Sequence, residues 1–328
     1  MPVAGRGQLR SPPMNGAVVD SLAPVILLIA SGYLAGRLGW LGQGSLKDLT
    51  NLIFLLLSPA LLFRTMSQVR IEQLDFMPVA AYFLAAGILF GGILLLQGFS
   101  RRSAVLALAG TFSNTVMIGI ALINLLFGAQ GLVTLLTLVS IHALVLLTLA
   151  TLVLEVAMRR DAAALPGDAP APQSTLAIVL QSLKSTVLHP VPLPILLGLL
   201  YAQTGWSIAP LIDKPLALLG AALSPLALVL VGVSLSLTSV GQHWRGALAL
   251  AGVKNLLHPV LVWALCRLLG VEGLPMTVMV VTAALPIGAN VFLFSQRYGV
   301  AQDLVTASVA MSSMLAMLTL TATLALMI

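Results

Sequence analysis

Charge and cysteine are both scarce in this chain. Only 8% of its 328 residues are Asp, Glu, Lys or Arg, whereas roughly a quarter of a soluble domain is charged. The single cysteine, Cys266, rules out an intramolecular disulfide and a cysteine-based metal site. The sequence also lacks the HExxH metal helix, the G-x-x-x-x-G-K-[ST] phosphate loop and paired Asp-rich motifs. We therefore expect no enzymatic activity, no metal or organic cofactor and no ATP hydrolysis within this chain.

Apolar residues take the place of the missing charge. They make up 59% of the chain, and the mean hydropathy is +1.07. Burying this much apolar surface requires lipid, and only helices or closed barrels satisfy all backbone groups in a bilayer. The apolar runs are much longer than the ~10 residues of a barrel strand. The sequence therefore predicts an all-α polytopic membrane protein with the lipid bilayer as a partner. The formal charge of +6 is sparse and scattered, which argues against a nucleic-acid partner.

Ten segments are long enough to cross a membrane, with ~20 residues per crossing as the gauge. We place them at about residues 22–38, 46–64, 76–99, 104–127, 130–157, 187–203, 209–238, 246–269, 274–297 and 300–328. Between the fifth and sixth, Leu165–Gln173 has the Pro, Ala and Gly content of a linker. We thus predict a disordered tail at 1–20, a five-helix repeat at 21–158, a cytoplasmic linker at 159–185 and a second five-helix repeat at 186–328. Because five is odd, two halves with the same fold form an inverted repeat.

Lysine and arginine predict the orientation, since cytoplasmic loops are enriched in both. Nine of the sixteen basic residues fall on one side of the predicted spans and six on the other, with Lys254 inside a span. Two of the six belong to the predicted tail. The first side is therefore expected to be cytoplasmic. This puts both termini on the extracytoplasmic side of a multi-pass protein in the cell (inner) membrane.

Two of the predicted spans contain residues that interrupt a helix. Thr282–Tyr298 carries Pro286, Gly288 and Asn290 near its middle, and proline both removes a backbone donor and clashes with the preceding turn. Gly110–Gly119 puts small and polar residues at the corresponding depth of the first half. Interrupted segments in corresponding halves mark the binding site of many carriers. We therefore predict a transporter whose substrate lies where these two interrupted stretches meet, with contacts from Asn114, Asn290, Ser113, Thr115 and Gly288.

Lys254 is the only charged residue expected deep within a span. A buried charge in a membrane is a functional hypothesis by default, so Lys254 joins the candidate substrate-binding residues. The alternative is a lysine that snorkels to an interface or pairs with backbone carbonyls. With one deep cation and no deep carboxylate, an anionic substrate is favoured. His258, one turn after Lys254, and His142 are candidates for proton coupling, and a purely structural role stays open for both.

Several alternatives within the transporter class stay open. The main prediction is a secondary active transporter of a small organic anion, a mono- or dicarboxylate. A sodium-coupled bile-acid-type symporter and a passive anion channel fit the same pattern. The coupling ion is left open between H+ and Na+, as is the formation of a homodimer. Saturable uptake with counterflow separates a carrier from a channel.

Short motifs spread along the chain resemble those of the auxin efflux carrier family, which includes bacterial malate and malonate permeases. The motifs are Leu57–Phe63 (LSPALLF), Ser113-Asn114 with Gly119, Ser224–Leu228 (SPLAL), Val231–Leu235 (VGVSL), Lys254 with Pro259, and Pro286–Phe292 (PIGANVF) followed by Gln296–Gly299 (QRYG). The resemblance covers about Leu22 to the end of the chain. It implies ten helices in two inverted repeats, a scaffold of spans 1, 2, 6 and 7, and a transport domain of spans 3–5 and 8–10.

The resemblance also implies an elevator-like movement of one domain against the other. It puts Asn114 and Asn290 at the junction of the crossing broken helices 4 and 9, with Lys254 nearby. Two departures from the family pattern are visible. Ile118-Gly119-Ile120 stands where bacterial relatives often have Gly-x-Pro, and the long cytoplasmic loop of many plant exporters is absent. The second departure favours the transport of small carboxylates.

Overall fold

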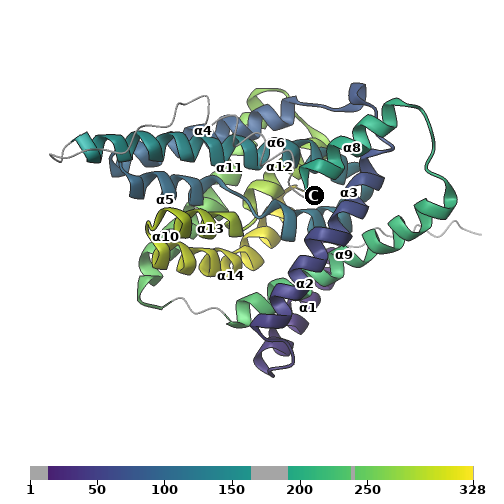
Figure 1. The fold of residues 1–328 in the computed structure, drawn as a ribbon, viewed down its shortest axis with the longest axis horizontal. Helices are drawn as coiled ribbons and strands as arrows, with labels where there is room; N and C mark the ends of the chain where they lie inside the picture. The colour runs from purple at the N-terminus through teal and green to yellow at the C-terminus, as the bar shows by residue number, and fades with distance from the viewer. Residues whose placement is uncertain (1–13, 164–190, 238–240, 328) are drawn as a thin grey trace, which may run out of the picture.

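The computed structural model describes residues 14–163, 191–237 and 241–327, and every regular element in these ranges is a helix (Figure 1). Helix α1 begins at Met14, within the tail that the sequence analysis placed at residues 1–20. Residues 1–13 of that tail lie outside the described ranges. So does most of the predicted linker at 159–185, of which residues 159–163 extend helix α6.

The helical elements follow one another with short connections. In chain order they are α1 (Met14–Arg37), α2 (Gln43–Leu52), η1 (Ile53–Leu57), α3 (Ser58–Met66), η2 (Ile71–Gln73), α4 (Met77–Gln97), α5 (Arg101–Thr111), η3 (Thr115–Gly119), α6 (Ile120–Ala163), α8 (Pro192–Gln203), α9 (Pro210–Leu237), η4 (Gly241–His243), α10 (Trp244–Gly252), η5 (Val253–Leu257), α11 (His258–Leu268), α12 (Gly273–Ala284), α13 (Ala289–Tyr298) and α14 (Gln302–Met327). Elements η1 and η5 are single π-helical turns inside longer helices, and η3 is the first turn of the helix that continues as α6; π-helical turns often occur near functional sites.

Six helical segments of the described chain are long and apolar enough to cross a membrane. They are Gln43–Met66, Met77–Gln97, Thr115–Met158, Pro210–Leu237, Gly241–Leu268 and Gln302–Met327. Three shorter apolar helices accompany them, at Ala23–Arg37, Pro192–Gln203 and Gly273–Ala284. The chain is therefore a multi-pass helical membrane protein.

Helix α6 changes direction at Gly128. Its 44 residues contain one non-helical position, Gly128, with φ 57° and ψ −151°. A straight helix of this length would measure about 66 Å at 1.5 Å per residue, about twice the hydrocarbon thickness of a bilayer. Only glycine adopts this backbone conformation without strain. Gly128 thus separates two helical arms: the first matches only the last part of the span expected at 104–127, and the second matches the span expected at 130–157.

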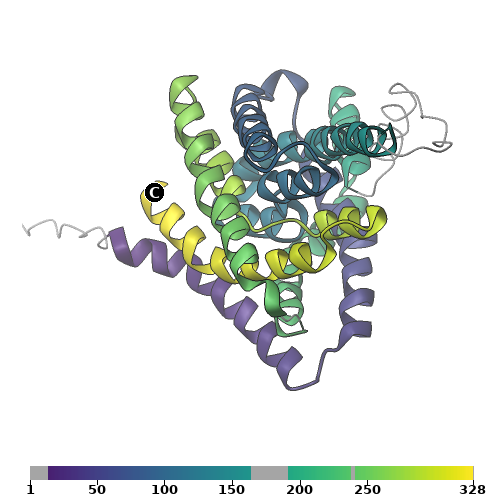
Figure 2. The same ribbon diagram turned by 90° about the vertical axis from the view of Figure 1, so that its left-hand side faces the viewer.

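The helices pack in two groups. Helix α1 runs along α9, while α3 packs against both α8 and α9. In the second group α4 packs against α5 and α11, α11 against α12, and α10 against α14. Figure 1 shows the first group on the right and at the bottom and most of the second group on the left. Figure 2 shows α1, in purple, along the lower edge of the molecule, where it contacts α14, in yellow.

Glycines bring α1 and α9 into backbone contact. A Cβ atom added to Gly32 would lie 1.9 Å from the carbonyl oxygen of Val229, and one added to Gly232 would lie 1.9 Å from that of Ile29. One turn further on, a Cβ at Gly36 would lie 1.9 Å from Oγ of Ser236. This is small-xxx-small packing, with the two helices contributing Gly-x-x-x-Gly and Gly-x-x-x-Ser. Close approach of this kind stabilises helix pairs in lipid, where no hydrophobic driving force acts between them.

An ion pair joins two helices of the first group near their ends. Nε of Arg64 on α3 donates to Oδ1 of Asp213 on α9 at 2.7 Å, and its Nη2 donates to Oδ2 at 3.1 Å. Both side chains are about one-third exposed. The bidentate geometry fixes the orientation of the two helices as well as their distance.

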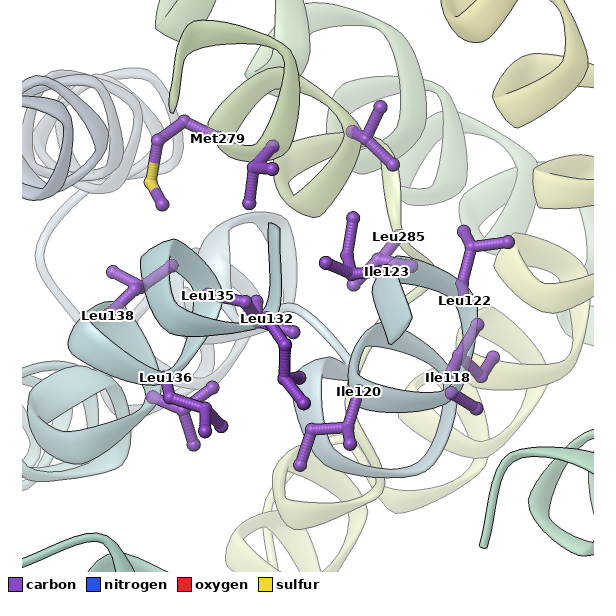
Figure 3. Packing of buried hydrophobic residues seen from close by; sticks show 14 of the residues in the cluster. Ile118, Ile120, Leu122, Ile123, Leu132, Leu135, Leu136, Leu138, Met279 and Leu285 are labelled. Atoms are coloured by element: carbon purple, nitrogen blue, oxygen red, sulfur yellow. The ribbon is translucent and has the colours of Figure 1, made fainter. Parts of the chain in front are cut away.

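The largest apolar core lies where the two groups meet. Figure 3 shows Ile118 and Ile120, at the junction of η3 and α6, together with side chains from the second arm of α6 and with Met279 and Leu285 near the end of α12. These side chains are almost fully buried. They pack both sides of the point where the broken helices meet, so the core holds that point in place.

Candidate functional site

Helix α12 breaks at Pro286. The residue before a proline is disfavoured in the α conformation, and Leu285 has φ −59° and ψ 150°. The helix therefore ends at Ala284, and α13 begins only at Ala289, after Gly288 with φ −71° and ψ 144°. The four residues between the two helices are extended or irregular and fully buried.

The first half breaks without a proline. Helix α5 ends at Thr111, and Phe112 is extended, with φ −83° and ψ 109°. Asn114 then caps the next helix, since its side-chain oxygen accepts a hydrogen bond from the backbone N–H of Met117 at 3.3 Å. Asparagine competes well for backbone donors at such a position. The break that the sequence predicted from small and polar residues thus forms around an asparagine cap.

The two breaks satisfy each other's backbone groups. Ser113 and Ile287 form an antiparallel bridge. The backbone N–H of Asn114 donates to the carbonyl of Pro286 at 2.9 Å, and that of Gly288 donates to the carbonyl of Phe112 at 3.0 Å. Unpaired backbone groups are very costly in hydrocarbon, so breaks at this depth require such partners. The two interrupted stretches therefore cross in contact, as a two-stranded junction between four half-helices.

Gly288 is the residue that allows this approach. A Cβ atom at Gly288 would lie 2.7 Å from Cδ1 of Phe112 and 3.1 Å from the carbonyl oxygen of Ser113. Both distances are shorter than ordinary contacts to a side chain, so any larger residue would push the two stretches apart.

A cavity of about 340 Å³ opens beside the crossing, within the size range of small-molecule sites. Both helix groups contribute to its wall. Its lining consists of Phe54, Phe112, Ser113, Asn114, Thr115, Val116, Met117, Val139, His142, Ala143, Leu147, Val191, Pro192, Gly288, Ala289, Asn290 and Phe294. The polar groups therefore come mainly from the two breaks, and apolar side chains surround them.

Most of the residues predicted as a site from the sequence meet at this cavity. Asn114, Asn290, Ser113, Thr115 and Gly288 all line it, as does His142. Asn290 is partly buried, and its side chain makes no hydrogen bond to any described residue, which leaves its amide available to a ligand. Three other candidates lie elsewhere: Pro286, Lys254 and His258 are not part of the lining.

Lys254 contacts the end of a helix. Its side chain is fully buried, and Nζ donates to the carbonyl oxygens of Ala283 at 2.5 Å and Leu285 at 2.7 Å. These carbonyls belong to the C-terminal turn of α12 and to the break, where no backbone N–H group of the same helix is available to pair with them. A positive charge at a helix C-terminus is also favoured by the helix dipole. The geometry matches the pairing with backbone carbonyls that the sequence analysis left open, and whether Lys254 also affects substrate stays a prediction.

Replacing Lys254 with methionine tests that role. We expect K254M to lower the free energy of unfolding by about 3 kcal/mol, because two buried carbonyls lose a charged donor. We also expect lower uptake, because the C-terminal end of α12 loses the contact that Lys254 makes with it. The measurements are thermal unfolding and ligand affinity of the purified protein. An unchanged affinity per folded molecule is expected for a capping role. A large loss of affinity with unchanged stability would instead put the ammonium on the substrate.

A buried aromatic and polar cluster lies behind the cavity. The hydroxyl of Tyr82, on α4, is 2.8 Å from Oγ of Ser113 and 3.2 Å from Nε2 of His142. The ring of His258 packs edge-on against that of Tyr82, with 5.1 Å between ring centroids and 60° between the ring planes. His142 and His258, both candidates for proton coupling, therefore contact the same tyrosine, and of the two only His142 lines the cavity.

Three polar residues that support the crossing were missed at the level of sequence. They are Tyr82, Ser312 and Asn255. Oγ of Ser312, on α14, accepts from the backbone N–H of Ile287 at 3.1 Å, and Asn255 donates to the carbonyl of Ser312 at 2.7 Å. The sequence holds only a weak indication of this role for Tyr82: before Gln97, its hydroxyl is the one polar side-chain group in the apolar sequence of α4. Nothing in the sequence indicated which break each residue supports.

A cavity with polar groups at the crossing of two broken helices, inside a bundle of apolar helices, is typical of membrane transporters. Comparison with known proteins agrees. The family model described as "Membrane transport protein" matches residues 17–324. The chain belongs to this family, the auxin efflux carrier family, which confirms the resemblance found in its motifs.

Two relatives match along nearly their whole length. The chain is 25% identical over 319 residues to a protein of Rhizobium meliloti (strain 1021) that is provisionally named a malonate transporter, with 93% of this chain and 94% of the relative covered. It is 22% identical over 309 residues to an uncharacterized transporter of Methanothermobacter thermautotrophicus, with 92% and 95% covered.

Proposed function

We propose that this protein is a secondary active transporter of small organic anions, with mono- or dicarboxylates as the substrate class. The observation that carries the proposal is the cavity at the crossing, into which Asn114 and Asn290 bring amide groups from the two breaks. Amide N–H groups are suitable donors to a carboxylate. The family membership and the name of the Rhizobium relative support the same class and suggest malonate as the first substrate to test.

The electrostatics of the crossing support an anion. The helix formed by η3 and α6 begins at the first break and α13 begins at the second. Both N-terminal ends therefore lie at the cavity, and helix N-termini carry partial positive charge. Broken helices of this kind direct that charge at anionic groups of the substrate in other transporters.

We also propose that ten crossings form two inverted repeats that move like an elevator. Two pairings support the repeat, because α1 packs on α9 of the other half while α8 packs on α3 of the first half. In this proposal α1, α2, α3, α8 and α9 form the scaffold and the remaining helices carry the crossing. Both termini are then extracytoplasmic in the inner membrane. A reporter fused after Ile328 that works only in the cytoplasm would overturn this orientation.

Counterflow in proteoliposomes tests the function. Vesicles loaded with unlabelled malonate are placed in trace radiolabelled malonate, and malate, indole acetate and taurocholate serve as competitors. We expect saturable accumulation that depends on internal malonate or malate, since a carrier exchanges one bound substrate for another. Flux that neither saturates nor responds to internal substrate would indicate a channel. If no counterflow occurs when each of the four acids is used in turn as the loaded and labelled substrate, the proposed substrate class is refuted.

A further inference from the structure

His142 lines the cavity and has one ring nitrogen without a partner among the described residues. The side chain is 1% exposed and belongs to the cavity lining. Nε2 is paired with the hydroxyl of Tyr82, but Nδ1 has no hydrogen-bond partner among the described residues. A buried polar nitrogen that stays unpaired is unfavourable. The free position is therefore suited to a ligand group that enters the cavity.

The hydrogen-bond chain behind His142 fits either charge state of the ring. Tyr82 has one hydroxyl proton and lies between Oγ of Ser113 and Nε2 of His142. If the hydroxyl donates to Nε2, it accepts from Ser113, and the neutral ring carries its proton on Nδ1. If His142 is protonated, Nε2–H donates to the hydroxyl, which then donates to Ser113. In both arrangements Nδ1–H needs an acceptor, and a carboxylate oxygen is the strongest acceptor available to it.

The charged surroundings make that acceptor important. The titratable groups near the ring are Tyr82 on α4, His258 on α11 and Lys254 on η5. Helices η3 and α12, which pack on α6, contain no titratable residue in their described parts. The titratable residues of the other helices packed on α6 lie near the ends of those helices, away from the middle of α6 where His142 lies. They are Arg64, Arg101, Arg102, Tyr201, Asp213 and Lys214. On α6 itself, Glu155 lies about 20 Å from His142 along the helix axis, at 1.5 Å per residue.

A proton on His142 is therefore a second positive charge in the region that already holds Lys254. In a site of low dielectric such a charge is disfavoured unless an anion accompanies it. A carboxylate at Nδ1 supplies that anion. Binding of the proton and binding of the anion then strengthen each other, as thermodynamic linkage requires.

We propose that His142 is the proton site of this carrier and binds one proton together with the carboxylate of the substrate. The coupling ion is then H+, taken from the water on the side where the substrate enters and released where the substrate leaves. This proposal rests on the proposed function, because it requires an anionic substrate at the crossing. His258 does not line the cavity and takes no part in it.

Calorimetry of malonate binding tests the proposal on the purified full-length chain. Titrations in two buffers with different protonation enthalpies give the number of protons bound per malonate, between about pH 7 and 9, where neither carboxyl group of malonate holds a proton. We expect about one proton per malonate in the lower part of this range, where the ring of His142 is neutral without the anion and protonated with it, and the dissociation constant there rises about tenfold per pH unit.

The variants H142Q and H258L separate the two histidines. Glutamine still donates to a carboxylate but does not titrate, so H142Q is expected to bind malonate with no proton uptake and with a flat pH profile. H258L removes a ring outside the cavity and is expected to keep the wild-type proton count. A wild-type count of zero overturns the proposal, whether or not H142Q folds. A wild-type number of bound protons in H142Q also overturns the proposal. The same holds if proton uptake is lost in H258L but kept in H142Q. Wild-type counterflow without proton uptake leaves the carrier function intact, whereas an absence of counterflow overturns both.

Discussion

Replacing Asn290 with alanine is expected to reduce malonate uptake about 100-fold while the protein remains folded. Asn290 lines the cavity at the start of α13, and no described residue takes up its amide group. The loss of a donor to a bound carboxylate costs about 3 kcal/mol in a site shielded from water, which corresponds to the stated factor. Initial uptake rates in proteoliposomes, normalised to reconstituted protein, provide the measurement.

Asn51 offers a matched control for this variant. It lies on α2 and is exposed, so Asn51→Ala makes the same chemical change away from the cavity and is expected to leave uptake unchanged. Equal uptake by Asn290→Ala and Asn51→Ala would show that the amide at position 290 does not contact the substrate.

The other asparagine of the crossing needs a different substitution. Asn114 caps η3 through its side-chain oxygen, so alanine would disturb the helix as well as the cavity. Aspartate keeps the cap, because a carboxylate accepts the same N–H group, and it adds a negative charge that repels an anionic substrate. Asn114→Asp therefore separates the two roles, and a folded variant without malonate binding is the result that the anion proposal requires.

The second large effect concerns assembly. Gly232→Leu is expected to prevent formation of the folded protein, because even the first side-chain atom would overlap the backbone of α1 at Ile29. A clash with backbone cannot be relieved by a change of rotamer, and separating α1 from α9 removes the closest helix contact of the first group. Size-exclusion chromatography in mild detergent, with the monodisperse fraction compared with wild type, measures the effect.

Gly87 provides the control for that experiment. It is an exposed helical glycine on α4, and a Cβ atom there would meet nothing within 4 Å. Gly87→Leu is thus expected to behave like wild type. A wild-type yield of folded Gly232→Leu would mean that α1 and α9 are not in backbone contact in the membrane.

Local chemistry explains which parts of the site could be predicted from sequence. Pro286 removes a backbone donor and disfavours the helical conformation of Leu285, while Gly288 and the asparagines are small or polar residues in an otherwise apolar run. The breaks and the residues that line the cavity followed from these local rules. The apolar runs likewise predicted where most of the helices lie, because the 3.6-residue geometry and the bilayer thickness set their length.

Contacts between distant segments explain what could not be predicted. Lys254 was expected among the substrate contacts because its charge is deep, but the direction of a lysine side chain depends on which carbonyls lie within reach, and those belong to α12. Tyr82 carries no motif, and its role depends on α4 lying beside both a break and α6. Gly232 was recognisable as a small residue, while the backbone it contacts, at Ile29, lies in a helix of the other half.

The junction of the two breaks also has a consequence for biosynthesis. Phe112 and Asn114 obtain their partners from Pro286 and Gly288, more than half of the chain later. When the first broken helix leaves the ribosome, its partner has not been made, so its backbone groups depend on water or on the insertion machinery until the second half arrives. Completion of the last third of the chain is therefore the step at which the nascent protein first becomes fully compatible with lipid. Chains that stop earlier are natural targets for membrane proteases.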